Sequence, residues 1–149
     1  MKRFNLENET EKSEAIEHIN ALAQKTGVMI QPYLTSADET GEHALLYFGG
    51  RFSHAIHRPL AGHHAEPDEE VARVTAMEPS QEALAIGDKI LATLPFQPAY
   101  MRVDLLLNEA GSYQLLELEM VEPSLFLAAS PGSEKLYVDA LEKGGYLAG

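Results

Sequence analysis

Three carboxylates lie in a segment that is otherwise apolar and strand-like, residues 102–119, which reads RVDLLLNEAGSYQLLELE. Asp104 belongs to the first apolar run of this segment, and Glu117 and Glu119 belong to the second. Because side chains alternate between the two faces of a strand, Arg102 and Asp104 share a face, as do the two glutamates. If the two runs pair as a hairpin, both pairs of side chains can converge on one patch.

Such a patch would suit a hard metal ion and a phosphate. Carboxylates that share a patch repel one another unless positive charge lies between them. Mg²⁺ takes oxygen ligands of this kind, often together with phosphate oxygens, and Arg102 is placed to bind a phosphate as a forked donor. A solvated sheet face with salt-bridged charges would show the same pattern, so the spacing alone leaves both interpretations open.

The elements that must position these residues include three predicted helices. Apolar side chains recur at helical spacing in residues 13–26, 81–94 and 134–143. Ser80 and Ser133 can cap the second and third of these helices, and Gly27 and Gly144 can end the first and third. Gly87, inside the second helix, is unfavourable for helix formation.

Strand-like runs cover residues 28–34, 43–48, 51–57, 99–107 and 112–120. Gly49 and Gly50 separate the second run from the third and are typical of a two-residue hairpin turn. Residues 35–42 predict a loop, and residues 60–79 predict a long loop that could include a short strand at 71–75. This order predicts an α+β fold, in which one antiparallel sheet holds both hairpins and the helices pack mainly on one face.

The bulk composition excludes several classes of protein. The 149 residues suffice for one domain with one core. A net charge of −12 repels nucleic-acid phosphates, so we expect no nucleic-acid partner. No apolar run is long enough to span a membrane, and the first residues do not form a secretory signal. The absence of cysteine excludes disulfides and thiolate zinc sites, and we expect a cytoplasmic location.

Five short motifs, taken in order, resemble the C-terminal lobe of ATP-grasp enzymes. They read QPYL, TGEHALLYFGGRFSHAI, MRVD, LLELE and EPSLF. The resemblance is to the glutathione-synthetase-like and amino-acid-ligase-like group, and it covers roughly residues 28–141. The spacing of Asp104, Glu117 and Glu119 also matches the metal ligands of the wider superfamily, with Glu119 in the position of an Asn.

The resemblance implies a role for the charged residues that match it. Asp104, Glu117 and Glu119 would be the Mg²⁺ ligands. Arg102 would contact a phosphate of ATP. The group usually carries a Lys after the SHA motif, and Arg58 or Arg73 would take its place here.

The resemblance also implies how the rest of the nucleotide is bound. The backbone of a hinge segment would pair with adenine, and its residues are Gln31, Pro32, Tyr33 and Leu34. Glu42 would accept the ribose hydroxyls. Without the resemblance, the hinge is equally well an ordinary edge strand that Pro32 ends, and Glu42 is a solvated loop acid.

The implied function is an ATP-dependent carboxylate–amine ligase, in which a small carboxylate substrate attacks the γ-phosphate and an amine then displaces the acyl phosphate. Residues 1–27 would form an N-terminal helix segment, and residues 28–149 would form the lobe. Family members have a further lobe before the hinge, with lysines that hold the α- and β-phosphates. Only Lys2, Lys12 and Lys25 precede the hinge here. We therefore expect this chain alone to be inactive, and to need a missing N-terminal lobe or a homodimer partner.

Two other functions fit the sequence. A non-catalytic binding or assembly module could keep the same fold with a vestigial metal patch. A small metal-binding protein could instead use histidines and a carboxylate to bind Zn²⁺ or Fe²⁺. Its candidate ligands are His54, His57, His63 and His64. On a strand, the spacing of His54 and His57 points their side chains to opposite faces, which disfavours a shared ion.

Overall fold

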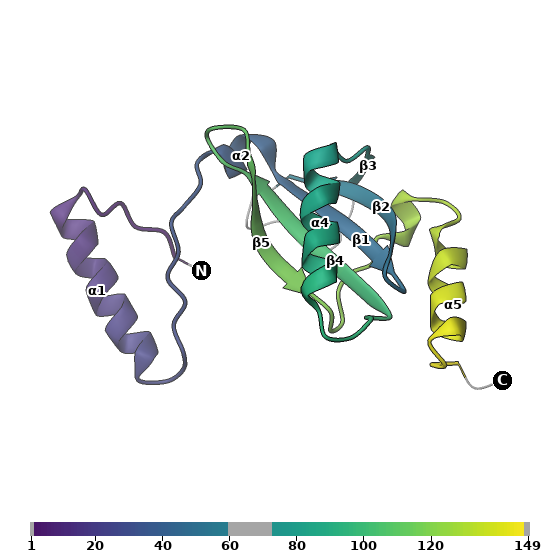
Figure 1. The fold of residues 1–149 in the computed structure, drawn as a ribbon. Coiled ribbons are helices and arrows are strands. Elements are labelled where there is room, and N and C mark those ends of the chain that lie inside the picture. Colours follow the sequence, from purple (N-terminus) through teal and green to yellow (C-terminus); the bar gives the residue numbers. More distant parts are fainter. Residues whose placement is uncertain (1, 60–72, 148–149) are drawn as a thin grey trace. The chain divides into compact units, whose positions relative to one another are not determined.

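The chain divides into two units, Met1–Tyr33 and Leu34–Gly149. The computed structural model, drawn in Figure 1, describes residues 2–59 and 73–147. Within these ranges, no helix combines the length and the apolar character that crossing a membrane requires.

The first unit contains α1 (Glu9–Ala23), which begins and ends earlier than the helix predicted at residues 13–26. Asn8 sets its start, because the side-chain oxygen of Asn8 accepts from the backbone N–H groups of Thr10 and Glu11 at 3.0 and 3.3 Å. Asn is among the strongest N-cap residues. Ser13 instead lies within the helix, where its hydroxyl donates to the Glu9 carbonyl oxygen at 3.0 Å.

The strand predicted at residues 28–34 is wrong, because these residues form neither helix nor strand. Met29 and Ile30 are 86% and 71% exposed. An apolar run becomes a strand only where a neighbouring backbone pairs with it, and Pro32 lacks the N–H that such pairing uses. Local pattern therefore overstated the structure of this segment.

The second unit is built on one antiparallel sheet with the strand order β3-β2-β1-β4-β5 (Figure 1). The strands are β1 (Glu42–Phe48), β2 (Arg51–Arg58), β3 (Thr75–Met77), β4 (Tyr100–Leu107) and β5 (Tyr113–Glu119). Both predicted hairpins form, and β1 pairs with β4, so the hairpins lie side by side. Gly49 and Gly50 make the β1–β2 turn with φ of 54° and 74°, values that favour glycine. The predicted α+β fold is confirmed.

Two short elements differ from the predicted loops. α2 (Ser36–Thr40) lies within the loop predicted at residues 35–42, and the Ser36 hydroxyl ties it to the Leu107 carbonyl oxygen at 2.6 Å. β3 lies slightly after the predicted strand and pairs with β2. Most of the long loop predicted at residues 60–79 lies outside the described residues.

One face of the sheet packs against α4 (Gln81–Thr93), which lies across the strands in Figure 1. Ser80 caps α4 as predicted, because its hydroxyl accepts from the Ala83 N–H at 3.1 Å. The buried core of this face consists of Leu45, Tyr47, Ala55, Ala83, Met101, Val103 and Leu105. Gly87 is explained by packing, since a Cβ on Gly87 would lie 2.2 Å from the Tyr47 hydroxyl. Gly87 therefore lowers the helix propensity of α4 but allows the helix to approach the sheet closely.

α5 (Ser133–Lys143) contacts β1 and β2, with the Tyr137 ring 5.2 Å from that of Phe48. The prediction that Ser133 caps α5 is wrong. Gly132 takes the cap position with φ of 94°, and the buried Ser133 hydroxyl has no hydrogen-bond partner among the described residues. A short 3-10 helix, η1 (Leu127–Ala129), precedes α5.

Candidate functional site

The sheet face opposite α4 carries the charged side chains. Asp104 lies opposite Glu117 in the β4–β5 pairing, and Arg102 lies opposite Glu119. Each of the three carboxylates offers an oxygen within 4.8 Å of the others. The structure therefore brings together the three carboxylates that we expected to converge if the two runs paired as a hairpin.

A β-bulge at Leu116 makes this placement possible. Asp104 pairs with Glu117, but the next residue of β4, Leu105, pairs with Leu115, so Leu116 is extra. Simple alternation would put Tyr113 on the same face as Glu117. With the bulge, Tyr113 packs in the core beneath α4, while the glutamates stay with Asp104.

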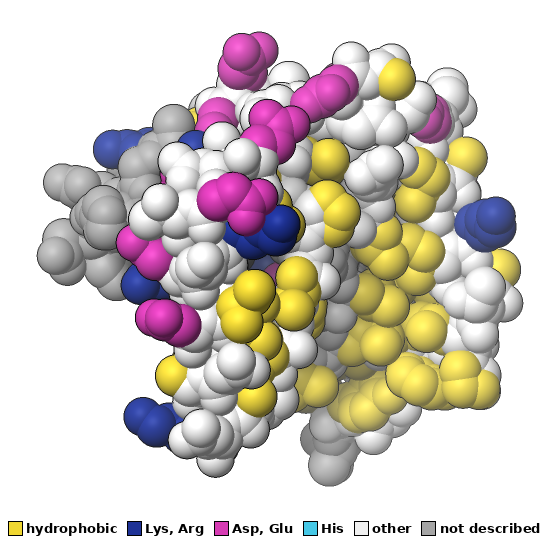
Figure 2. Space-filling model, turned by 90° about the vertical axis from the view of Figure 1, so that its left-hand side faces the viewer, with side chains coloured by type: hydrophobic (Ala, Val, Ile, Leu, Met, Phe, Trp, Pro, Cys, Tyr) yellow, Lys and Arg dark blue, Asp and Glu magenta, His cyan; other side chains and the backbone are white. Residues whose placement is uncertain are grey.

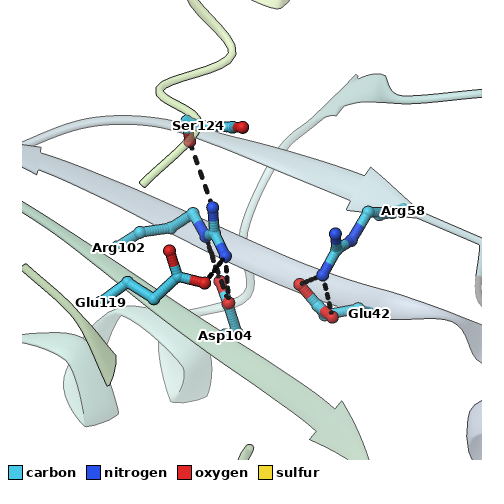
Figure 3. Close-up of polar contacts among 6 residues, drawn as sticks. All are labelled: Glu42, Arg58, Arg102, Asp104, Glu119 and Ser124. Carbon is cyan, nitrogen blue, oxygen red and sulfur yellow. Dashed lines mark hydrogen bonds and ion pairs between the residues drawn. The ribbon is translucent and has the colours of Figure 1, made fainter. Parts of the chain in front are cut away.

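Only part of this site is exposed to solvent. Asp104 has no exposed surface and Arg102 is buried, whereas Glu119 is half-buried and Glu117 is exposed. The chain after β5 returns over the buried half, as the contact between Arg102 and Ser124 in Figure 3 illustrates. The acidic side chains are therefore accessible to solvent at the β5 edge, whereas the β4 side of the site is buried.

Arg102 is the centre of the charged group (Figure 3). Its Nε donates to both oxygens of Asp104 at 2.8 and 3.1 Å, and its Nη2 donates to Asp104 at 2.8 Å and to Glu119. Nη1 donates to the Ser124 carbonyl oxygen at 3.3 Å. Burial alone would lower the pKa of Arg102, but its bonds to Asp104 and the nearby carboxylate charges outweigh burial and raise it. Arg102 is thus held as a permanent cation.

A second ion pair lies on the same face. Arg58 Nη2 donates to both oxygens of Glu42 at 2.9 and 2.7 Å, and Glu42 is only 1% exposed. Burial raises the pKa of Glu42, and the charge of Asp104 adds to the rise, while Arg58 opposes it. Glu42 therefore begins β1 in a closed pair, rather than lying in a solvated loop.

The four carboxylates and two guanidinium groups of this face carry a formal net charge of −2. One divalent cation would neutralise this net charge. We call the six residues the charged face: Glu42, Arg58, Arg102, Asp104, Glu117 and Glu119.

The hinge residues are not part of the charged face. Gln31, Pro32 and Tyr33 end the first unit, and Leu34 begins the second. Tyr33 has the guanidinium of Arg3 4.0 Å from its ring centroid. Their adenine-binding role stays a prediction.

The histidines do not gather around an ion in the part of the chain that the structure describes. Within residues 2–59 and 73–147, the one group of three or more possible metal ligands is Asp104, Glu117 and Glu119. His57 contacts the Thr40 carbonyl oxygen at 2.8 Å, and His54 contacts that of Leu125 at 3.1 Å. The other two histidines of that hypothesis lie outside the described residues.

Sequence reasoning missed the residues that cover the charged face. We call residues 122–126 the strap. Its carbonyl groups bond to Arg102 and His54, and Phe126 presents its ring to Arg102, 5.7 Å from the guanidinium carbon. The EPSLF motif marks this segment in the sequence, but no local pattern indicates which strands it contacts.

Comparisons with known proteins show what the chain resembles in sequence and in fold. No protein-family model matches the chain. The chain is 34% identical over 131 residues to the cycloserine biosynthesis protein DcsG of Streptomyces lavendulae, an alignment that covers 80% of this chain and 43% of that protein. The crystal structure of the D-cycloserine synthetase DcsG superposes with a TM-score of 0.72 and 30% identity, over 88% of this chain and 48% of that one.

More distant structures share the fold alone. D-alanine–D-alanine ligase from Bacillus anthracis, complexed with ATP, matches with a TM-score of 0.57 and 16% identity, over 89% of this chain and 47% of that one. A RiPP-associated ATP-grasp ligase from Chryseobacterium gregarium matches with a TM-score of 0.50 and 11% identity, over 72% and 34%. The chain thus spans about half the length of DcsG and of the D-alanine–D-alanine ligase, and about a third of the RiPP-associated ligase. In sequence and in fold, it corresponds to the C-terminal lobe of an ATP-grasp ligase.

Proposed function

We propose that this chain is the Mg-ATP-binding C-terminal lobe of an ATP-dependent carboxylate–amine ligase that acts through an acyl phosphate. The observation that carries the proposal is the charged face, where three carboxylate oxygens lie within 4.8 Å of one another beside Arg102. The similarity to D-cycloserine synthetase supports a small amino-acid-like substrate.

The donor set fits Mg²⁺. All three side chains offer hard oxygen atoms, and Mg²⁺ binds such atoms at about 2.1 Å, which places neighbouring ligands of one ion roughly 3–4 Å apart. The three oxygens already lie within 4.8 Å of one another, so they need to move little to reach that spacing. Glu117 is exposed and Glu119 is half-buried, which leaves both side chains room to move. A bound Mg²⁺ would neutralise charge that develops on the transferred phosphoryl group.

The chain's own residues would orient this chemistry. Asp104 is fixed by two N–H groups of Arg102, so its oxygens have one defined direction. Arg102 would contact a phosphate of ATP and stabilise its negative charge. Glu42, which is paired with Arg58, would accept hydrogen bonds from the ribose hydroxyls. Gln31, Pro32, Tyr33 and Leu34 would supply the adenine hinge.

The remaining half of the nucleotide site would come from elsewhere. The relatives are about twice as long as this chain, so we propose that another lobe or a second copy provides the phosphate-binding lysines. Large apolar side chains are exposed in the second unit, including Phe96, Leu115, Leu116, Val121 and Tyr146. Figure 2 shows apolar side chains gathered over a broad area of one face. Such a surface is typical of an interaction site.

One observation favours the alternative of a non-catalytic module. Arg102 already bonds Asp104 and Glu119, so the charged face is partly neutralised without a cation. A module that kept the fold and lost the chemistry would be stable in this state.

Calorimetry with ATP, with and without Mg²⁺, separates the two functions. We expect Mg²⁺-dependent binding no tighter than roughly millimolar, because two or three missing charge-assisted contacts cost about 1.5–3 kcal/mol each. Asp104→Asn should abolish it, while Glu142→Gln, the same charge change at an exposed site on α5, should not. Binding that does not depend on Mg²⁺ or on Asp104 contradicts the proposal. Micromolar binding or ATP hydrolysis would show that this chain supplies the absent half itself.

A further inference from the structure

The strap has a strained backbone at both ends. Glu122 and Phe126 have φ of 56° and 47°, and they are the non-glycine residues with positive φ among those the structure describes. Non-glycine residues rarely adopt this left-handed backbone conformation, and it persists only where surrounding contacts hold it. The contacts of the strap therefore indicate what fixes it in place.

Two neighbouring carbonyl groups of the strap bond to side chains on two different strands. The Ser124 oxygen accepts from Arg102 on β4, and the Leu125 oxygen accepts from His54 Nε2 on β2 at 3.1 Å. A carbonyl oxygen only accepts, so Nε2 of His54 carries the proton. Its Nδ1 then accepts from the Ser53 hydroxyl at 2.9 Å. His54 is 7% exposed, so both ring nitrogens are satisfied inside the protein.

The two anchors lie in one row across the sheet. His54 is opposite Leu46 in the β1–β2 pairing, Leu46 is opposite Arg102 in the β1–β4 pairing, and Arg102 is opposite Glu119 in the β4–β5 pairing. The strap crosses this row with its carbonyl groups toward the sheet. His54 at one end of the row and Arg102 within it thus hold the strap, and Glu119 lies at the other end.

We propose that His54 is a positioning residue for the charged face, and the inference rests on the proposed function. His54 holds the strap so that the Ser124 carbonyl oxygen stays within reach of Arg102 Nη1. Arg102 then turns its other N–H groups to Asp104 and Glu119 in a fixed direction. Without this anchor, Arg102 is free to pair more fully with the glutamates and to compete with a cation for them.

Amide hydrogen exchange of the cation-free protein tests the anchor. The Ala129 N–H bonds to the Phe126 carbonyl oxygen at 2.9 Å and the Ser130 N–H bonds to that of Leu127 at 3.1 Å, so both report on the end of the strap. In His54→Phe, which keeps a ring but loses the donor, we expect their exchange to be about tenfold faster. His54→Gln, which can still donate, should restore much of the protection.

His43→Phe is the matched control, because His43 also hydrogen-bonds, to the Tyr113 hydroxyl at 2.8 Å, but on the face of the sheet that carries the α4 core. It should leave exchange at Ala129 and Ser130 unchanged. Equal protection in wild type and His54→Phe overturns the inference, whatever the protein binds.

Mn²⁺ titration followed by electron paramagnetic resonance tests the link to the charged face. We expect at least fivefold weaker Mn²⁺ binding in His54→Phe, recovery in His54→Gln, and no change in His43→Phe. Unchanged affinity in His54→Phe overturns the positioning role even if the strap loosens. If wild type binds no Mn²⁺ but His54→Phe speeds exchange, the proposed function and the positioning role fail, and only the anchoring contact stands.

Discussion

At the scale of single residues, Arg102 decides how the charged face is stabilised. Asp104 has no exposed surface, and its carboxylate accepts three hydrogen bonds from Arg102. A buried carboxylate without a partner is costly, whereas the gain from a satisfied buried pair is small. Arg102 therefore matters mainly because of what its loss would leave behind.

Arg102→Leu should lower the free energy of unfolding by about 3–5 kcal/mol, because it leaves Asp104 buried and unpaired. Arg51→Leu, at an exposed position on β2, should change it by less than about 0.5 kcal/mol. Millimolar Mg²⁺ should raise the melting temperature of Arg102→Leu more than that of wild type, since it would replace the lost positive charge. Thermal unfolding with and without Mg²⁺ measures both effects, and equal Mg²⁺ responses would argue against a cation site.

At the scale of elements, the sequence predicted the two hairpins and α4 because their signals are local. Alternating residues, the Gly49–Gly50 turn and the Ser80 cap each act within one element. The carboxylate patch was predictable in part for the same reason, since both strands belong to one hairpin, but the bulge at Leu116 that sets its register was not predicted. The strand at residues 28–34 failed because strand formation needs a distant partner, and the strap was missed because its anchors lie on β2 and β4.

The two serine positions before α4 and α5 should behave differently. Ser80→Ala removes a cap bond and should cost about 1 kcal/mol of unfolding free energy. Ser133→Ala removes a buried hydroxyl that has no partner among the described residues, so it should be neutral within about 0.5 kcal/mol or stabilising. Urea unfolding of both variants checks this, and an equal loss at the two sites would mean that Ser133 does cap α5.

Gly87→Ala should destabilise the protein although alanine favours helix by about 1 kcal/mol. The new Cβ would lie 2.2 Å from the Tyr47 hydroxyl, and overpacking costs roughly 1–3 kcal/mol. In a Tyr47→Phe background the loss should shrink, which a double-mutant cycle measures. Gly27→Ala is the control, since a Cβ there meets nothing within 4 Å. Additive effects of the two changes would show that α4 simply shifts away.

At the scale of the whole molecule, the chain combines a well-formed sheet with a large share of exposed apolar surface. The strands and α4 bury one core. On the side of the sheet that carries the charged face, a second core is formed by Ala44, Leu46 and Ile56, which pack against Leu125, Phe126 and Ala129. Both faces of the sheet are thus covered in part. In the function proposed above, a further lobe or a second copy would cover part of the exposed apolar surface.

The stability of the chain should fall as pH drops below 6.5. Burial lowers the pKa of both His43 and His54 from the ordinary value of 6.5, with the charge of His57 adding to the effect on His43 and the Leu125 and Phe126 backbone opposing it on His54. The unfolded chain therefore takes up these protons first, and stability present above pH 6.5 is lost as pH falls toward the folded values.

Chemical denaturation from pH 7.5 to 5.5 measures this loss. Each histidine contributes at most about 1.4 kcal/mol per pH unit. The double variant His43→Gln, His54→Gln should show a shallower slope than wild type. The raised pKa of Glu42 acts with the opposite sign, because the folded chain binds that proton more readily than the unfolded chain, so it does not account for a loss of stability as pH falls. An unchanged slope in the double variant would contradict the assignment.

The extra residue at Leu116 joins two alternating patterns that are out of phase. Before it, the odd-numbered residues of β5 face the α4 core; after it, the odd-numbered residues face the charges. Deleting this one residue would therefore leave a single continuous alternation, in which Tyr113 still faces the α4 core and the two glutamates still face the charges. A single insertion beside Leu116 that the bulge did not absorb would instead move Tyr113 to the side of the two glutamates, so the local geometry at this one position decides which residues of the hairpin share a face.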